Sequence, residues 1–387
     1  MLFKQLQQKV QQRRETGLLR QTRVFDAVDA RHLTYEGRAY LNFSSNDYLG
    51  IGSDSKPQKA ETSGAMASPL VVGRTKIHQQ LEHLLLEWLG APASHACMLF
   101  SSGYAANSGL VHALFNEKVG NALLLQDRLN HASLLASGAL VQSQGYVRQF
   151  RFKHNDLEHL SELVTKHEAM TKPSLAITEG VFSMDGDAPD LAQFHSLLSS
   201  HSIPWMLDDA HGIGALGAEG RGSLDAQGLS LEDCDILVVT FGKAVGAQGA
   251  AVIAKQGIID YLTNFSKEYI YSTHLSPMQA GAVINNIQAI RKEQWRRDKL
   301  SENIDYFRSN LASTNYSLMA SQSAIQPLIV GDERDALQLS ELLQSSGIWA
   351  SAMRYPTVAK GAARLRITLT TKHEKEDLDR LLELLND

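Results

Sequence analysis

Short apolar runs alternate with longer amphipathic stretches from about residue 76 to about residue 275. The short runs predict buried strands, and stretches with an apolar residue at every third or fourth position predict helices. Strands that alternate with helices favour a mostly parallel sheet covered on both faces, so we expect a large α/β domain. The expected strands cover residues 96–100, 122–125, 147–150, 174–178, 205–207, 236–241 and 250–254, and the expected helices cover 77–89, 105–114, 131–140, 157–168 and 191–199.

The pattern changes towards both ends of the chain. Residues 1 to about 20 predict a polar helix, and residues 277–309 predict a long one. Further strand-like segments cover residues 23–25, 39–43, 323–330 and 363–368. We therefore expect an N-terminal helix and arm over residues 1–45, a large domain over 46–275 and a smaller α+β domain over 276–387.

Composition excludes several classes of partner. The chain has 387 residues, of which 43% are hydrophobic and 20% charged, with a net charge of −5. This balance offers no basic field for nucleic acid or an anionic membrane surface. The N-terminus lacks the apolar core of a signal peptide, and no run reaches the ~18 apolar residues of a membrane span. We expect a cytoplasmic protein with reduced Cys97 and Cys234 and, from their spacing, no metal site.

Two reactive side chains follow apolar runs. Lys243 ends the segment Thr240-Phe-Gly-Lys243, and Asp208 follows the run at 205–207. Ligands of open α/β sheets collect outside the carboxyl ends of strands, where both residues are expected. Pyridoxal phosphate needs an amine that forms a Schiff base and a carboxylate that holds its protonated ring nitrogen. Taken singly, a surface lysine and a capping aspartate are the more common interpretations.

Further polar residues follow the neighbouring strands. Gly103 lies between a strand and a helix, where the backbone can approach a phosphate, although a plain turn is equally common there. His131 could lie on an aromatic ring or serve only as a hydrogen-bonded residue near a helix start. Asp209 competes with Asp208, and we favour Asp208 because His211, three residues on, can turn back towards the same ligand.

Taken together, these motifs resemble those of the α-oxoamine synthase family, fold-type I pyridoxal-phosphate enzymes with a mostly parallel large domain and a smaller α+β C-terminal domain. The resemblance covers nearly the whole chain. It rests on Leu41-Asn-Phe-Ser-Ser-Asn-Asp-Tyr-Leu-Gly50, Thr178-Glu-Gly-Val-Phe-Ser-Met-Asp-Gly186, Asp208-Asp-Ala-His-Gly212, Thr240-Phe-Gly-Lys243, Ser323-Ala-Ile-Gln-Pro-Leu-Ile-Val-Gly-Asp332 and Ala363-Arg-Leu-Arg-Ile-Thr-Leu369.

The resemblance implies a role for each matching residue. It implies that Lys243 carries the cofactor and moves the substrate's α-proton, that Asp208 pairs with the ring nitrogen and that His131 stacks on the ring. The other implied cofactor contacts are Gly103, Tyr104, Ser183, His211 and Thr240, with Ser272 and Thr273 reaching the phosphate of a neighbouring subunit in a homodimer. The implied substrate contacts are Arg366, Asn46, His131, Thr357 and Arg20, with Arg23 as the alternative to Arg20.

The resemblance also implies a reaction. It points to decarboxylative condensation of L-alanine with a pimeloyl thioester, either pimeloyl-CoA or pimeloyl-ACP, in biotin biosynthesis. A sister enzyme that joins glycine or serine to another acyl group is the first alternative, because the catalytic core is shared. A non-catalytic homologue that binds the cofactor is the second. A nucleotide-binding α/β protein would need a G-x-G-x-x-G or P-loop motif after a strand, and the sequence has neither.

Two segments depart from the family pattern. A glycine-rich run is replaced by Gly64-Ala-Met-Ala-Ser-Pro-Leu-Val-Val-Gly-Arg74, and glycine usually marks a special backbone conformation or a close approach. We therefore expect this loop to differ in conformation. Gln248 stands in the small-residue run after Lys243 and could alter the floor of the acyl channel. Both changes bear on acyl-chain preference rather than on the catalytic groups.

Overall fold

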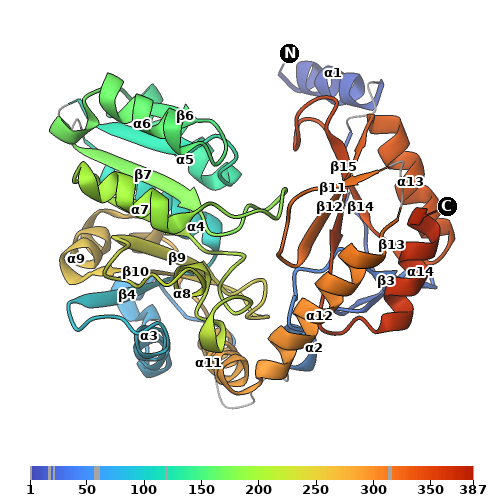
Figure 1. Ribbon diagram of the computed structural model, residues 1–387. Coiled ribbons are helices and arrows are strands. Elements are labelled where there is room, and N and C mark those ends of the chain that lie inside the picture. Colours follow the sequence, from blue (N-terminus) through green and yellow to red (C-terminus); the bar gives the residue numbers. More distant parts are fainter. Residues whose placement is uncertain are drawn as a thin grey trace.

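The protein is described by a computed structural model over residues 2–15, 19–20, 22–55, 62–117, 121–312 and 316–386. The large domain is built around a seven-stranded sheet with the strand order β4-β10-β9-β8-β7-β5-β6 (Figure 1). All neighbouring strands are parallel except β10, which runs antiparallel to both β4 and β9. The strands are β4 (His95–Phe100), β5 (Leu123–Asp127), β6 (Arg148–Phe152), β7 (Ser174–Glu179), β8 (Trp205–Asp208), β9 (Ile236–Thr240) and β10 (Ala250–Lys255).

Helices cover both faces of this sheet, as the apolar pattern predicts. Side chains alternate across a pleated strand, so Leu123 and Leu125 of β5 join one core cluster while Leu124 joins the other. One face is covered by α4 (Gly103–Leu114), α5 (Ala132–Ser143), α9 (Gln256–Phe265) and α10 (Lys267–Ile270). The other face is covered by α3 (Lys76–Trp88), α6 (Leu157–Lys166), α7 (Leu191–Ser200), α8 (Ser223–Ala226) and α11 (Pro277–Lys292).

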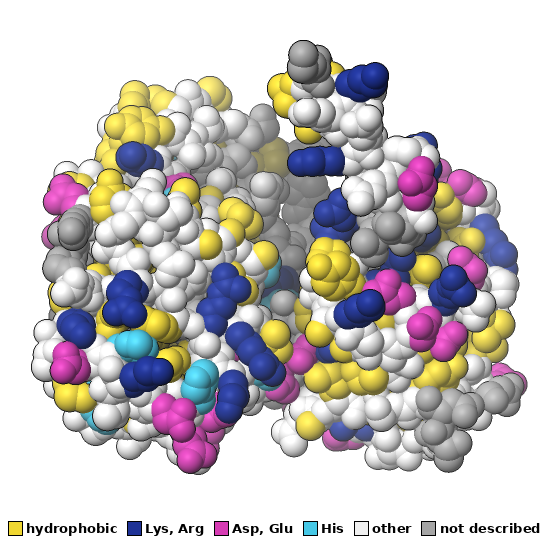
Figure 2. All heavy atoms as spheres, turned by 90° about the horizontal axis from the view of Figure 1, so that it is seen from above, with side chains coloured by type: hydrophobic (Ala, Val, Ile, Leu, Met, Phe, Trp, Pro, Cys, Tyr) yellow, Lys and Arg dark blue, Asp and Glu magenta, His cyan; other side chains and the backbone are white. Residues whose placement is uncertain are grey.

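The C-terminal part forms a second lobe, and a groove separates the two lobes in the view from above (Figure 2). An antiparallel sheet with the order β11-β12-β15-β14 packs there with three helices. The elements are α12 (Gln294–Asn310), β11 (Ser317–Leu318), β12 (Ile325–Gly331), α13 (Glu333–Ser345), β13 (Ile348–Trp349), β14 (Ser351–Met353), β15 (Ala363–Thr368) and α14 (Lys375–Asn386). The prediction of an α/β fold with a smaller α+β part is confirmed.

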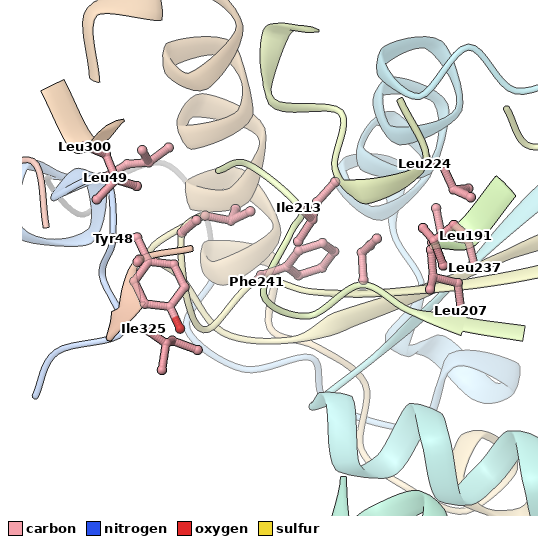
Figure 3. Packing of buried hydrophobic residues seen from close by; sticks show 14 of the residues in the cluster. Tyr48, Leu49, Leu191, Leu207, Ile213, Leu224, Leu237, Phe241, Leu300 and Ile325 are labelled. Atoms are coloured by element: carbon pink, nitrogen blue, oxygen red, sulfur yellow. The ribbon is translucent and has the colours of Figure 1, made fainter. Parts of the chain in front are cut away.

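The N-terminal arm joins this second lobe. Helix α1 (Leu2–Glu15) is exposed along its whole length, and β3 pairs in parallel with β13. The arm contains β1 (Ala27–Val28), β2 (His32–Tyr35) and β3 (Arg38–Asn42), and the short α2 (Ile51–Asp54) follows it. One core cluster continues from the large sheet into this lobe, as Tyr48, Leu49, Leu300 and Ile325 show beside Phe241 (Figure 3). No helix in the described ranges is long and apolar enough to span a bilayer.

Two sequence predictions about elements are wrong. The helix expected over 277–309 is two helices, because α11 ends at Lys292 and Glu293 adopts φ −100° and ψ 64° before α12 begins. Helix α11 packs on α3 of the large sheet, whereas α12 packs on α14, so the chain must turn between two lobes. Residues 23–25 form no strand; instead Arg23 lies over the ring of Trp349, with 4.9 Å from its Cζ to the ring centroid.

Candidate active site

A cavity of about 290 Å³ opens at the carboxyl ends of the parallel strands. The segments that follow several strands of the sheet border this cavity, and each contributes at least one polar side chain. The site is therefore assembled from segments far apart in sequence. The lining residues are Asn46, Ser101, Ser102, Gly103, Tyr104, Asn107, His131, Glu179, Asp208, Ala210, His211, Thr240, Gly242, Lys243, Ala247, Gln248 and Gly249.

Lys243 reaches this cavity from the turn after β9. Burial lowers the pKa of its amine, while the nearby carboxyl groups of Asp208 and Glu179 oppose that shift. The amine Nζ lies 2.8 Å from Nε2 of His211, and Nδ1 of His211 lies 2.7 Å from the hydroxyl of Tyr48. Burial, followed by the charge of Lys243, holds the pKa of His211 well below its usual value. A neutral imidazole therefore links Tyr48 to the lysine amine.

The two adjacent aspartates at the end of β8 face different surroundings. Asp208 lines the cavity, and its Oδ2 accepts a hydrogen bond from Nδ2 of Asn107 at 2.7 Å. Asp209 points away and accepts hydrogen bonds from the backbone amide and hydroxyl of Ser223 at 2.8 and 2.5 Å. Burial raises the pKa of Asp209 to about 7 despite those bonds. Of the two, only Asp208 can meet a ligand in this cavity.

His131 caps the start of α5 and borders the cavity. Its Nδ1 lies 2.7 Å from the hydroxyl of Ser133, and its backbone amide donates to the carboxyl of Glu179. Tyr104 stands edge-on to the His131 ring, with 6.5 Å between the ring centroids. Burial lowers the pKa of His131, whereas burial and the neighbouring Asp208 raise the pKa of Glu179. The wall beside Asp208 thus carries a neutral ring and a carboxyl group that resists ionisation.

The start of α4 fits an anionic group. The amide of Ala105 donates to the capping hydroxyl of Ser102 at 3.2 Å, while the amides of Gly103 and Tyr104 are those that a helix N-terminus presents to an anion. A Cβ at Gly103 would lie 2.5 Å from Cγ2 of Thr240, so only glycine lets the backbone come this close. The Thr240 hydroxyl is buried and has no hydrogen-bond partner within the described residues. A phosphate at this position would satisfy both the amides and that hydroxyl.

Arg366 approaches from β15 of the second lobe. Its Nε donates to the backbone carbonyl of Ser183 at 2.8 Å, and both terminal nitrogens lie 3.3 Å from Oδ1 of Asn46, a lining residue. Its Nη1 also donates to the hydroxyl of Thr368 at 3.0 Å. The guanidinium is therefore fixed in orientation next to the cavity, as bidentate binding of a carboxylate requires.

Comparison with known proteins shows the family of this chain. The family model described as aminotransferase class I and II matches residues 38–385. An 8-amino-7-oxononanoate synthase from Vibrio vulnificus (strain CMCP6) is 43% identical over 385 residues, covering 98% of this chain and 96% of the relative. The chain belongs to the class I and II aminotransferase family, among the 8-amino-7-oxononanoate synthases.

Solved structures share the whole fold with this family member. An 8-amino-7-oxononanoate synthase from Francisella tularensis has a TM-score of 0.73 and 26% identity, covering 90% of this chain and 97% of that chain. A serine palmitoyltransferase variant from S. paucimobilis, with bound PLP-myriocin aldimine, has a TM-score of 0.85 and 23% identity, covering 99% and 96% of the two chains. The second likeness establishes the fold alone.

Several predicted residues lie outside the lining of the cavity, and Arg366 reaches it only through its contact with Asn46. Arg20 donates from Nη2 to the hydroxyl of Thr357 at 3.2 Å on an exposed surface, so the two predicted substrate contacts lie together. Arg23, the alternative to Arg20, is occupied with the ring of Trp349. Ser272 and Thr273 precede α11 and do not line this chain's own cavity. Ser183 offers its carbonyl to Arg366, and its side chain does not line the cavity either.

Sequence reasoning missed Asn107, Glu179 and Tyr48. Asn107 is a buried polar residue in helix α4, whose buried residues are mostly apolar, and this was the available signal. Glu179 ends β7 in register with Asp208 of β8, so the strand-end pattern that identified Asp208 applied to it as well. Tyr48 lies in the conspicuous segment Leu41–Gly50, but nothing in the spacing connects it with His211.

Proposed function

We propose that this protein condenses L-alanine with a pimeloyl thioester to give 8-amino-7-oxononanoate, carbon dioxide and a free thiol. It would act as a pyridoxal-phosphate-dependent C-acyltransferase of biotin biosynthesis. The observation that carries the proposal is the grouping of the Lys243 amine, the Asp208 carboxylate and the unpartnered Thr240 hydroxyl around one cavity. The 43% identity to a synthase of that name supports it along nearly the entire chain.

The residues around the cavity fit pyridoxal phosphate. When bound, the cofactor supplies an electron sink for negative charge at the α-carbon of an amino acid. Lys243 would hold its aldehyde, Asp208 its ring nitrogen and His131 the face of its ring. The remaining contacts would be the amides of Gly103 and Tyr104, the side chains of His211 and Thr240, and Ser272 and Thr273 of a second copy. Ser183, expected from the sequence to contact the cofactor, would instead hold Arg366 through its carbonyl.

Lys243 is placed to move the α-proton of alanine. Its Nζ must be neutral to accept that proton, and burial lowers its pKa in the required direction. His211 holds Nζ at 2.8 Å and keeps it directed into the cavity. Because the imidazole of His211 is neutral, it holds the amine without placing a second cation beside the lysine.

Arg366 would bind the carboxylate of alanine beside Asn46. A guanidinium presents two parallel N–H groups to a carboxylate, and its Nε contact with the Ser183 carbonyl sets the plane of that fork. Arg20 and Thr357 would meet the acyl donor farther out on the exposed surface. The donor is pimeloyl-CoA or pimeloyl-ACP, and Gln248 borders the cavity where acyl-chain length would be sensed.

We further propose a cytoplasmic homodimer with shared active sites. Two free, buried cysteines are consistent with a reducing compartment. Leu70, Val71 and Val72 expose half or more of their surface in one short turn, which is the kind of apolar surface that subunit contacts cover. A second copy would bring Ser272 and Thr273 towards the phosphate position.

Thiol release distinguishes this function from its sister activities. The cofactor-loaded protein would be offered L-alanine, glycine or L-serine with pimeloyl-CoA, acetyl-CoA, succinyl-CoA or a long-chain acyl-CoA. Release confined to L-alanine with pimeloyl-CoA is the expected result. Release with glycine and a short acyl donor would instead assign a sister activity. If no CoA ester releases thiol, the assay is repeated with pimeloyl-ACP as the acyl donor.

A further inference from the structure

His154 lies between two carboxylates outside the cavity. It follows β6, and its Nδ1 lies 3.1 Å from Oδ1 of Asp127, while its Nε2 lies 2.8 Å from Oδ2 of Asp187. Only 14% of its side chain is exposed. Burial alone would lower the pKa of His154, but the two carboxylates outweigh it and raise the pKa to about 10. The ring is therefore a cation at neutral pH and donates one hydrogen bond to each carboxylate.

The same group of side chains has the spacing of a metal site. His154, Asp185 and Asp187 each offer a ligand atom within 4.8 Å of the others. Both ring nitrogens of His154 are already occupied, however, and Oδ1 of Asp185 accepts from Nη1 of Arg364 at 2.6 Å. The positive charge in this cluster is thus supplied by His154 and Arg364, which leaves no nitrogen lone pair for a metal ion.

Asp187 closes a tight turn over residues 182–187, here named the 182–187 turn. The amide of Phe182 donates to the carbonyl of Asp187 at 2.9 Å, and the amide of Gly186 donates to the carbonyl of Phe182 at 2.8 Å. The edge of the His154 ring also contacts Phe182, with 4.4 Å between the ring centroids. On its large-domain side, the turn is therefore held by His154 through both charge and packing.

The other side of the 182–187 turn faces the second lobe. Arg364 binds Asp185, and the hydroxyls of Ser321 and Ser323 donate to the carbonyl of Gly186 at 2.8 and 2.9 Å. The carbonyl of Ser183 accepts from Nε of Arg366. The turn thus connects the His154 cation with the arginine proposed to bind the substrate carboxylate.

We infer that His154 is a positioning residue for the amino-acid substrate, because it fixes the 182–187 turn that orients Arg366. It touches neither substrate nor cofactor. The inference rests on the proposed function, since it takes Arg366 as the carboxylate contact. Loss of the His154 charge should let the Ser183 carbonyl move and weaken amino-acid binding more than it affects the acyl donor.

Spectral titration of the cofactor-loaded protein with L-alanine tests this inference. For His154→Gln we expect the alanine dissociation constant to rise about tenfold, the scale of one lost charge-assisted contact. The KM for pimeloyl-CoA and the turnover rate at saturating alanine should change less than about twofold. His195→Gln is the control for the substitution itself, because His195 faces only one carboxylate, Asp233 at 3.8 Å, and does not line the cavity.

A second variant separates positioning from general damage. Asp187→Asn removes the other half of the contact and should weaken alanine binding by a similar factor. The double variant should lose about tenfold rather than about a hundredfold, because both changes break the same His154–Asp187 contact. If His154→Gln does not fold, Asp187→Asn alone carries the same prediction. Unchanged alanine affinity, or an equal loss of affinity for alanine and for the acyl donor, overturns the inference. A cofactor-loaded wild-type protein whose spectrum does not change with L-alanine overturns the proposed function instead.

Discussion

Asn107 connects helix α4 with the carboxylate at the end of β8. Its Nδ2 lies 2.7 Å from Oδ2 of Asp208 and 3.0 Å from the hydroxyl of Ser133. Asn107→Ala would leave Asp208 without that donor, which costs about 1–3 kcal/mol for a buried group. We expect cofactor affinity to fall about tenfold or more in equilibrium dialysis. Asn264→Ala, at an exposed helical position, should leave the affinity unchanged.

Gly103 is required by the space around it. An alanine there would place Cβ 2.5 Å from Cγ2 of Thr240 and force α4 or β9 to move. We expect Gly103→Ala to abolish tight phosphate binding, measured as loss of pyridoxal-phosphate retention during gel filtration. Gly257→Ala is the control, because a Cβ at that helical glycine meets nothing within 4 Å. Full retention by Gly103→Ala would show that the phosphate lies elsewhere.

At this scale the sequence identifies residues whose neighbours are close along the chain. Lys243 and Asp208 follow apolar runs, so their place at the edge of the sheet was predictable. Asn107 finds its partner 101 residues away, and His211 meets Tyr48 across 163 residues. Such pairs depend on how separate elements pack against one another, and the residues near each partner in the sequence do not indicate that packing. Asp208 was favoured over Asp209 by its spacing to His211, and the contact of Asp209 with Ser223 gives that preference a structural reason.

Helices and strands were predictable from the hydrophobic pattern where the whole element packs within one lobe. The expected strand at 174–178 and the helix at 157–168 differ from β7 and α6 by only one or two residues at their ends. The helix expected over 277–309 breaks at Glu293 because its halves pack on different lobes. The altered loop at 64–74 contains a π-helical turn, Pro69–Gly73, and the backbone of Ala67 accepts from His274, so it is tied to the junction before α11.

The contact between His154 and the 182–187 turn should make folding stability depend on pH. The pKa of His154 is about 10 in the folded protein and near 6.5 when unperturbed. Its contribution is therefore fully present below pH 6.5 and is lost as pH rises towards about 10. We expect the difference in urea midpoint between wild type and His154→Gln to be largest near about pH 6 and to shrink steadily up to about pH 10. A difference that grows with pH would contradict the assigned charge.

The molecule as a whole presents apolar surface that a single copy leaves uncovered. Leu70, Val71 and Val72 are 51%, 72% and 64% exposed, next to the loop that leads into α3. We expect a dimer in sedimentation equilibrium, and Val71→Asp should shift it towards monomer because a charge would have to be buried in the contact. Val24→Asp, at an 84% exposed position of the arm, is the control. A wild-type monomer that retains its cofactor would contradict the shared site.

The central claim is that the cavity between the lobes uses Lys243 to move the α-proton of alanine. Proton NMR of L-alanine in deuterium oxide, with cofactor-loaded protein and no acyl donor, tests this step without depending on the identity of the thioester. The account predicts that the wild-type protein replaces the α-proton of L-alanine with deuterium, that Lys243→Ala does not, and that His195→Gln does so normally. Undiminished exchange by Lys243→Ala, or none by the cofactor-loaded wild-type protein, would contradict it.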